Sequence, residues 1–306
     1  MAFRSLFEPA SQATDAAFRA WTQHVDAMLT GPCGLVQTAD TGQMDLAAGT
    51  VPVVSPQYQG YRIYRMNDAL QASAPVFLKV EYGWGGASTT TPGIGVTIGS
   101  GTNGAGSITG AFWTTFALYL GGAVAAPAPW MACGGEGYAS LMVALEGTFR
   151  GMALCLERWR NSDGSYNGTG LCGLAMANGA SFGFTCMSVE FGQTGAHRGT
   201  TSPFYPVQVF DRTHIHSLVG RNAVRAYIPR RTLVDARALV PPPKSFVVTD
   251  SNLAGHTSSS TPWVMAHQIH VDGAWRPYAT AFFLYPTSQY PSYHNDARTT
   301  LALLME

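Results

Sequence analysis

The sequence predicts a mainly β fold, a β-sandwich, jelly roll or distorted barrel, with one amphipathic helix near the N-terminus. Apolar and polar residues alternate with period two in many short segments, which is typical of half-buried strands. Glycine and proline, with 34 and 18 residues, supply turns between such strands. Only 12% of the 306 residues are charged, which is about half of the usual share.

The clearest alternation lies in residues 76–113 and predicts a glycine-rich β-hairpin. In residues 76–82, apolar side chains alternate with residues that include Lys79 and Glu81. In residues 94–99, isoleucine and valine alternate with glycine and threonine. A pair of strands with this pattern buries one face. We expect the uncharged face to be covered, either by another part of the chain or by another subunit.

Residues 11–30 are predicted to form the helix, which Gly31 and Pro32 end. Five apolar residues recur along it at intervals of three and four: Phe18, Trp21, Val25, Met28 and Leu29. This apolar face must be buried, and two alternatives are open. The helix packs either on the β domain of its own chain or in a groove on a neighbouring subunit.

Residues 1–32 are therefore expected to form an N-terminal helical arm and residues 33–306 a β-rich domain, with a subdivision near 241–245 at the stiff step Pro241–Pro243. Residues 35–56 are predicted to connect elements and to contain one short strand. Further strands are expected around Tyr61 and Ile63 and at residues 141–145, 152–158, 171–176, 182–189, 207–216, 223–228, 246–249, 264–271, 278–285 and 300–304.

Charge and composition limit the partners. The formal net charge is zero, so no overall field attracts nucleic acid or an anionic membrane. Basic residues gather between Arg221 and Lys244, either to contact nucleic-acid phosphate or to form a solvated or intersubunit ion-pair face. Apart from Tyr227 this region lacks the interleaved aromatic residues of a surface that binds single strands. We expect no nucleic-acid partner.

The mostly apolar segment 111–132 is interrupted by glycine and proline and lacks basic flanking residues, so no membrane span is expected. The N-terminal segment lacks the features of a signal peptide. The five cysteines are widely spaced, without a C-x-x-C pair. We expect them to be buried thiols of a protein synthesised in a reducing cytoplasm, and one or two disulfides remain the alternative.

Gly99–Gly104 matches the dinucleotide-binding pattern G-x-G-x-x-G and follows a predicted strand. The pattern binds pyrophosphate only where a helix begins at it, with an acidic residue about twenty positions later. Here glycine and β-branched residues continue to Gly110, and the next acidic residue is Glu136. We expect a hairpin and no cofactor.

Gly179–Gly183 matches the nucleophile-elbow pattern G-x-S-x-G around Ser181, and His197 and Asp211 follow it. The elbow requires a helix after the serine, whereas residues 182–189 read as a strand. The order of the three residues also differs from the serine, acid, histidine order of that fold. No catalytic residue is therefore expected in the chain.

Two histidine pairs, His214 with His216 and His267 with His270, supply imidazoles that could bind zinc. Residues 267 and 270 of one strand lie on opposite faces, and no carboxylate is placed as a fourth ligand. We expect hydrogen-bonded histidines at an interface and no metal site.

Several segments resemble structural proteins of tailed-bacteriophage particles. Pro75–Gly85 and Pro92–Gly110 resemble a strand-loop-strand signature of these proteins. Leu156–Gly164 (LERWRNSDG) is similar to their ERxRxxDG hairpin, and Trp275–Tyr278 resembles a late Arg-x-Tyr element. The segments cover only part of the chain, and the part after Val207 matches poorly.

The resemblance implies a non-enzymatic virion component in the tail, baseplate or neck, present in several copies and bound to other virion proteins. The chain would be synthesised in the bacterial host cytoplasm. Aromatic, apolar and basic residues are the interface candidates: Phe18, Trp21, Val25, Leu29, Trp84, Trp113, Arg225, Arg230 and Arg231.

Two other functions are alternatives. A carbohydrate- or receptor-binding β module of a phage tail would bind a host-surface glycan through aromatic faces, for which Trp84, Trp113, Trp130 and Tyr290 are available. A β-rich hydrolase would require carboxylates that converge within about 5 to 10 Å.

Overall fold

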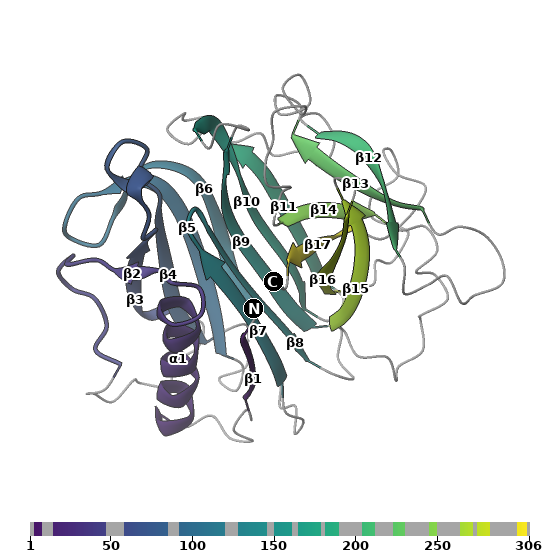
Figure 1. The fold of residues 1–306 in the computed structure, drawn as a ribbon. Helices are drawn as coiled ribbons and strands as arrows, with labels where there is room; N and C mark the ends of the chain where they lie inside the picture. The colour runs from purple at the N-terminus through teal and green to yellow at the C-terminus, as the bar shows by residue number, and fades with distance from the viewer. Residues whose placement is uncertain are drawn as a thin grey trace.

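A computed structural model of the chain, drawn in Figure 1, consists mostly of antiparallel β-structure with one α-helix near the N-terminus. The mainly β class and the helix are thereby confirmed. The structure describes residues 3–7, 15–46, 58–84, 92–119, 128–145, 150–160, 165–178, 181–189, 204–211, 223–229, 245–249, 264–271, 274–281 and 299–304.

The strands form three groups. The N-terminal sheet has the order β2-β3-β4-β5-β6, with β2 at Val36–Gln37, β3 at Tyr58–Arg65, β4 at Phe77–Trp84, β5 at Pro92–Thr102 and β6 at Ile108–Tyr119. The central sheet has the order β1-β7-β8-β9-β10-β11, with β1 at Phe3–Phe7, β7 at Ala128–Gly135, β8 at Tyr138–Leu145, β9 at Arg150–Arg160, β10 at Tyr166–Asn178 and β11 at Ser181–Val189.

The C-terminal strands are β12 at Phe204–Asp211, β13 at Ala223–Pro229, β14 at Ser245–Thr249, β15 at Val264–Val271, β16 at Ala274–Ala281 and β17 at Thr299–Leu304. They pair in the order β12-β13-β14-β17-β16-β15, and β12 also pairs with β15. These pairings join strands from both sides of the subdivision that was predicted near residues 241–245. The choice between sandwich, jelly roll and distorted barrel stays a prediction.

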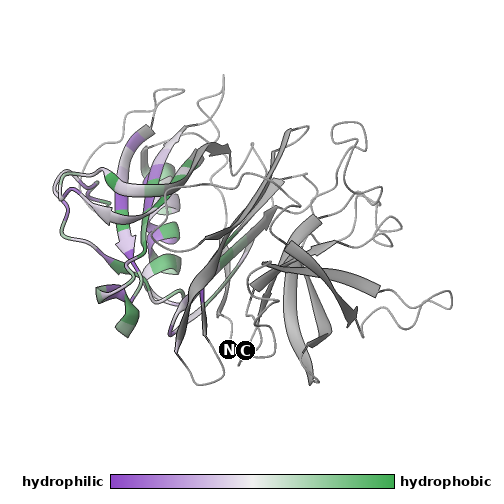
Figure 2. Cartoon of the chain, turned by 90° about the horizontal axis from the view of Figure 1, so that it is seen from above, coloured by the Kyte–Doolittle hydropathy of each residue, from purple (hydrophilic) through white to green (hydrophobic). Residues whose placement is uncertain are grey.

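Helix α1 spans Asp15–Thr30, and the short 3-10 helix η1, Ala69–Ala72, connects β3 to β4. The helix ends where Gly31 and Pro32 predicted, and its five predicted apolar residues are all buried. In Figure 2, green marks hydrophobic residues, and such residues lie on α1 and on the strands beside it. No helix within the described residues is long and apolar enough to cross a membrane.

One hydrophobic core is shared by α1, the N-terminal sheet and the central sheet. The N-terminal sheet contributes alternate residues of β4 and β5, as the period of two predicts: Leu78, Val80, Tyr82, Ile94, Val96 and Ile98. The central sheet contributes Trp130, Ala132, Ala139, Leu141, Leu154 and Leu156. The apolar face of the predicted hairpin is therefore covered by the chain itself.

Both faces of β7, β8 and β9 are buried. Residues adjacent in sequence, such as Leu154, Cys155 and Leu156, are 3%, 0% and 1% exposed although they alternate between faces. Strand β16 approaches β8 and β9, and β17 approaches β10. The central sheet therefore lies between the N-terminal sheet and the C-terminal strands (Figure 1).

The predicted strands that fall within the described residues are present; residues 212–216 and 282–285 lie outside them. Strand β1 was not predicted. It pairs with β7, with Ser5 opposite Trp130, so contacts cross the predicted boundary between residues 32 and 33. Strand β16 begins at Ala274, earlier than the predicted start at residue 278. The prediction began too late because Pro277 argues against a strand.

Candidate functional site

The helix residues predicted as interface candidates lie in the chain's own core. Phe18, Trp21, Val25 and Leu29 are 1%, 4%, 0% and 1% exposed. The ring of Trp21 lies edge-on to that of Tyr82, with 6.0 Å between the centroids. Of the two alternatives, the structure shows the helix packed on its own chain. No partner reaches these four side chains while the helix stays in place.

The other interface candidates lie apart from one another. Trp84 is the last residue of β4 and lies opposite Pro92 of β5. Trp113 is on β6 and lies opposite Ile98 of β5. The third described candidate, Arg225, is on β13 among the C-terminal strands. Residues 230 and 231, the other two arginine candidates, and residue 290, the tyrosine proposed for glycan stacking, lie outside the described residues.

The dinucleotide-like pattern is part of a β-hairpin, as predicted. Strand β5 continues to Thr102, and β6 begins at Ile108 after a turn. The elbow-like serine, Ser181, is the first residue of strand β11, so no helix follows it. His197 lies outside the described residues. Neither pattern has the helix that its chemistry requires.

The histidine pairs are only partly described. On β15, His267 is opposite Tyr278 and His270 is opposite Trp275, so the two histidines lie on opposite faces of the strand. His214 and His216 lie outside the described residues. Among the residues whose positions are described, no group of three His, Cys, Asp or Glu side chains could hold a metal ion.

The most deeply buried charges form a cluster around Arg158, which belongs to the ERxRxxDG-like segment. Its Nε donates to Oδ2 of Asp68 at 2.8 Å, its Nη2 donates to Oε1 of Gln71 at 3.1 Å, and its Nη1 donates to the carbonyl oxygen of Ala74. The side chains of Arg158 and Asp68 are 0% and 1% exposed. The cluster ties β9 to the connection between β3 and β4.

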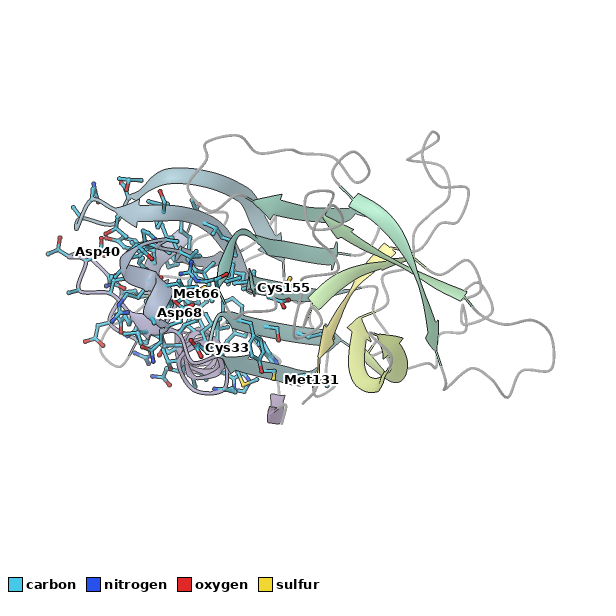
Figure 3. All side chains as sticks on the ribbon, turned by 45° about the horizontal axis from the view of Figure 1, so that its top comes forward. Cys33, Asp40, Met66, Asp68, Met131 and Cys155 are labelled. Carbon is cyan, nitrogen blue, oxygen red and sulfur yellow. The ribbon has the colours of Figure 1, made fainter. Side chains whose placement is uncertain are left out.

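The hydrogen bonds of this cluster give it a structural role. A guanidinium group stays protonated, so Arg158 cannot act as a base. Gln71 also accepts the amide hydrogen of Val76 at 3.1 Å, whereas its Nε2 and the second oxygen of Asp68 have no hydrogen-bond partner among the residues that the structure describes. In Figure 3, Asp68 lies among the interior side chains.

Sequence reasoning missed the partners of Arg158, although one signal was available. Leu154, Leu156 and Arg158 occupy alternate positions of a strand and therefore lie on the same face. A charged residue that continues an apolar face predicts a buried charge, which requires a partner. The sequence does not say which acidic residue that partner is.

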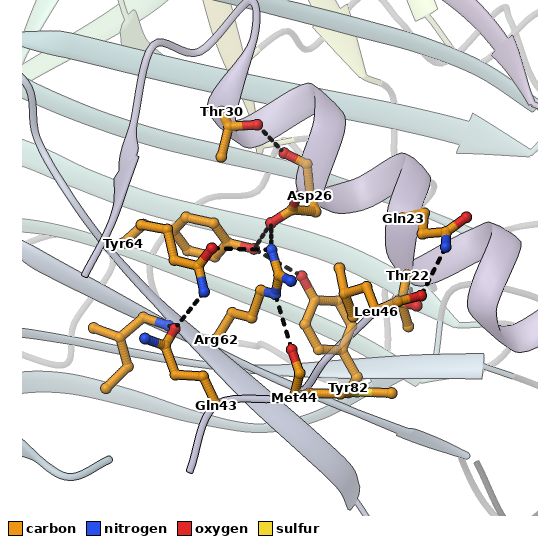
Figure 4. A network of polar contacts seen from close by, with 12 residues as sticks. Thr22, Gln23, Asp26, Thr30, Gln43, Met44, Leu46, Arg62, Tyr64 and Tyr82 are labelled. Atoms are coloured by element: carbon orange, nitrogen blue, oxygen red, sulfur yellow. Dashed lines mark hydrogen bonds and ion pairs between the residues drawn. The ribbon is translucent and has the colours of Figure 1, made fainter. Parts of the chain in front are cut away.

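A second cluster, which is buried at its tyrosines and half-buried at its charged pair, joins α1 to β3 and β4 (Figure 4). One oxygen of Asp26 accepts from Nη1 of Arg62 at 2.8 Å and from the hydroxyl of Tyr64 at 2.7 Å. The hydroxyls of Tyr64 and Tyr82 are 3.1 Å apart. Burial raises the pKa of both tyrosines. They therefore remain neutral hydrogen-bond donors and hold the helix on the sheet.

The tip of the β5–β6 hairpin is held by hydrogen bonds to Asp40, and its outermost residues are exposed. Asp40 accepts hydrogen bonds from the hydroxyls of Thr38 at 2.6 Å and Thr102 at 3.1 Å. Burial opposes ionisation of Asp40, but these bonds and one from the amide of Gly106 keep its pKa below the ordinary value. Residues 103–105 are exposed and uncharged. The tip is thus a fixed, neutral surface element.

Three of the predicted thiols are buried: Cys33, Cys133 and Cys155. The thiol of Cys33 donates to the carbonyl oxygen of Ser140 at 3.2 Å, and burial raises its pKa. The sulfur of Cys133 is 3.1 Å from the hydroxyl of Tyr138. The burial of these three residues agrees with the prediction of buried thiols.

We expect Cys33, Cys133 and Cys155 to react with iodoacetamide at least about a hundredfold more slowly than exposed cysteine, because burial keeps the reagent away from their sulfur atoms. Peptide mass spectrometry after labelling of the folded chain measures the modification of each residue. Labelling after unfolding in guanidinium chloride is the control. Rapid labelling of Cys133 in the folded chain would contradict the structure.

His24 on α1 should make stability depend on pH. Its ring lies edge-on to Trp130 with 4.9 Å between the centroids, and burial lowers its pKa. The unfolded chain therefore binds a proton at higher pH than the folded chain does. The contribution of neutral His24 to the free energy of unfolding is complete above the unfolded pKa of about 6.5. It is lost as the pH falls below that value.

Urea unfolding of the parent chain and of His24→Gln at pH 8 and pH 5 tests this expectation. The free energy of unfolding should fall less in the variant than in the parent when the pH is lowered. Equal losses in the two proteins would show that His24 does not cause the pH dependence.

The described clusters join elements that are distant in sequence, and the patterns with catalytic or cofactor precedent are not assembled as their chemistry requires. Comparison with protein-family models, curated proteins and solved structures finds no match to this chain.

Proposed function

We propose that the chain is a non-enzymatic structural component of a tailed-bacteriophage particle. It would assemble in several copies in the tail, baseplate or neck, through contacts with its own copies and with other virion proteins. The observation that carries the proposal is that the segments that resemble phage structural proteins lie on neighbouring elements of the structure.

These segments are far apart in the sequence but adjacent in the structure. Arg158, in the segment Leu156–Gly164, binds the connection that leads directly into Pro75–Gly85. Leu78 of the latter segment and Leu156 belong to the same core. Trp275–Tyr278 lies on β16, which approaches β9. Their proximity supports one structural signature rather than chance matches of separate glycine-rich strands.

The described contacts suit a rigid building block. The buried charge of Arg158 is paired with Asp68 and the half-buried charge of Arg62 with Asp26, so the sheets and α1 are held at fixed positions. Neutral copies do not repel one another. Assembly would then gain about 25 cal/mol of free energy for each Å² of apolar surface that it buries, before the cost of association is subtracted.

The finer architecture is part of the proposal. Of the predicted forms, a sandwich-like packing of the N-terminal sheet on the central sheet agrees best with the shared core, because both sheets contribute side chains to it. Helix α1 would fill one side of this packing.

Multi-angle light scattering of the purified full chain tests the proposal. A particle mass that is a multiple of 32.6 kDa is expected at high concentration, and electron microscopy should show a regular assembly. A chain that remains monomeric at every concentration would remove the main support for a structural role. Retention on a glycan array by such a monomer would favour the receptor-binding alternative.

A further inference from the structure

The two sheets have four edge strands, and three of them carry features that prevent pairing with another chain. Unpaired backbone groups at an edge attract further strands unless the edge is short, charged or bulged. Strand β2 has two residues, and β1 has five with Arg4 among them. Strand β6 is long, but its register with β5 shifts twice, between Ile94 and Val96 and between Ile98 and Gly99.

The fourth edge, β11, lacks all of these features. It has nine residues, SFGFTCMSV, without proline or charge. Its register with β10 runs without a shift from Ser181 opposite Asn178 to Val189 opposite Gly170. Within the described residues β11 pairs with β10 alone. The outer edge of β11 thus offers a regular row of backbone donors and acceptors to an extended segment.

We propose that β11 of one copy pairs antiparallel with β11 of a second copy and joins their central sheets into one continuous sheet. This inference rests on the proposed function, since it names one contact through which the copies assemble. A strand that pairs with its own copy across a two-fold axis is antiparallel. Every described strand pair in this chain is antiparallel too, and neutral copies do not repel one another.

The register follows from the length of the strand. Pairing all nine residues places Thr185, the middle residue of β11, opposite Thr185 of the second copy. Phe184 then lies opposite Cys186, and Phe182 lies opposite Ser188, in both halves of the pair. The central pair of threonines is of a kind that stabilises cross-strand contacts.

Hydrogen exchange of the full-length chain at low and high concentration tests the contact without a substitution. In residues 181–189, exchange should slow by about tenfold when the concentration is well above the dissociation constant, whereas β10 should be protected at both concentrations. Oligomers that form without protection of residues 181–189 would overturn this inference and leave the proposed function standing. A monomer at every concentration would overturn both.

Two matched substitutions test the edge and its register. Thr185→Lys places two lysines opposite each other at the two-fold axis and should weaken association by at least about tenfold. Thr109→Lys adds the same charge to an exposed position of the bulged edge β6 and should leave association unchanged. Equal association of two folded variants would overturn the inference. If Thr185→Lys does not fold, the exchange experiment on the parent chain decides.

Discussion

Replacing Arg158 by alanine should lower the free energy of unfolding by about 3–5 kcal/mol, because it leaves the carboxylate of Asp68 buried without its cation. The substitution also removes the donors for Gln71 and for the carbonyl oxygen of Ala74. Both acceptors would then remain in a site from which water is largely excluded, since the side chains of Arg158 and Asp68 are 0% and 1% exposed. Urea unfolding monitored by circular dichroism measures the change.

A double-mutant cycle separates the ion pair from the rest of the cluster. Combining Arg158→Met with Asp68→Leu should recover part of the loss, with a coupling energy of about 1–3 kcal/mol. The recovery is incomplete because Gln71 and Ala74 still lack their donor. Additive losses would show that the two charges do not stabilise each other.

The more exposed pair Lys79–Glu81 provides the control. Its atoms are 3.0 Å apart, but the two side chains are 17% and 32% exposed. Lys79→Met should therefore change the free energy of unfolding by no more than about 1 kcal/mol. If Lys79→Met lost as much stability as Arg158→Ala, burial of an ion pair would not determine how much stability its removal costs.

The local pattern of the sequence was sufficient for the elements but not for their pairing. Alternation at residues 76–82 predicted β4 and the face that it buries, because the period of two is a property of each strand. Strand β1 was missed because FRSLF is short, and its place depends on β7, more than 120 residues later. The inclusion of Pro277 in β16 similarly depends on the neighbouring strands.

The candidate site shows the same division. That Arg158 continues an apolar face could be predicted from Leu154 and Leu156, whereas its pairing with Asp68 joins residues 90 positions apart. The apolar stripe of the helix predicted burial but was equally consistent with a neighbouring subunit. The structure distinguishes these alternatives because Trp21 contacts Tyr82 of the same chain.

Replacing Trp21 by alanine should lower the free energy of unfolding by about 3–5 kcal/mol, since it empties a large volume of the core. Trp21 is 4% exposed and contacts both Phe18, with 5.9 Å between ring centroids, and Tyr82. The cavity would lie between α1 and β4, where the hydrogen bonds of Asp26 also hold the helix. Urea unfolding followed by tryptophan fluorescence and circular dichroism measures the loss.

Thr30→Ala, at an exposed position of the same helix, is the control and should change the free energy of unfolding by no more than about 0.5 kcal/mol. The folded fraction of Trp21→Ala should assemble with the same affinity as the parent chain, because β11 lies in the central sheet and Trp21 packs against the N-terminal sheet. Lost assembly with unchanged stability would instead place Trp21 at a contact between subunits. That outcome would contradict its burial in the chain's own core.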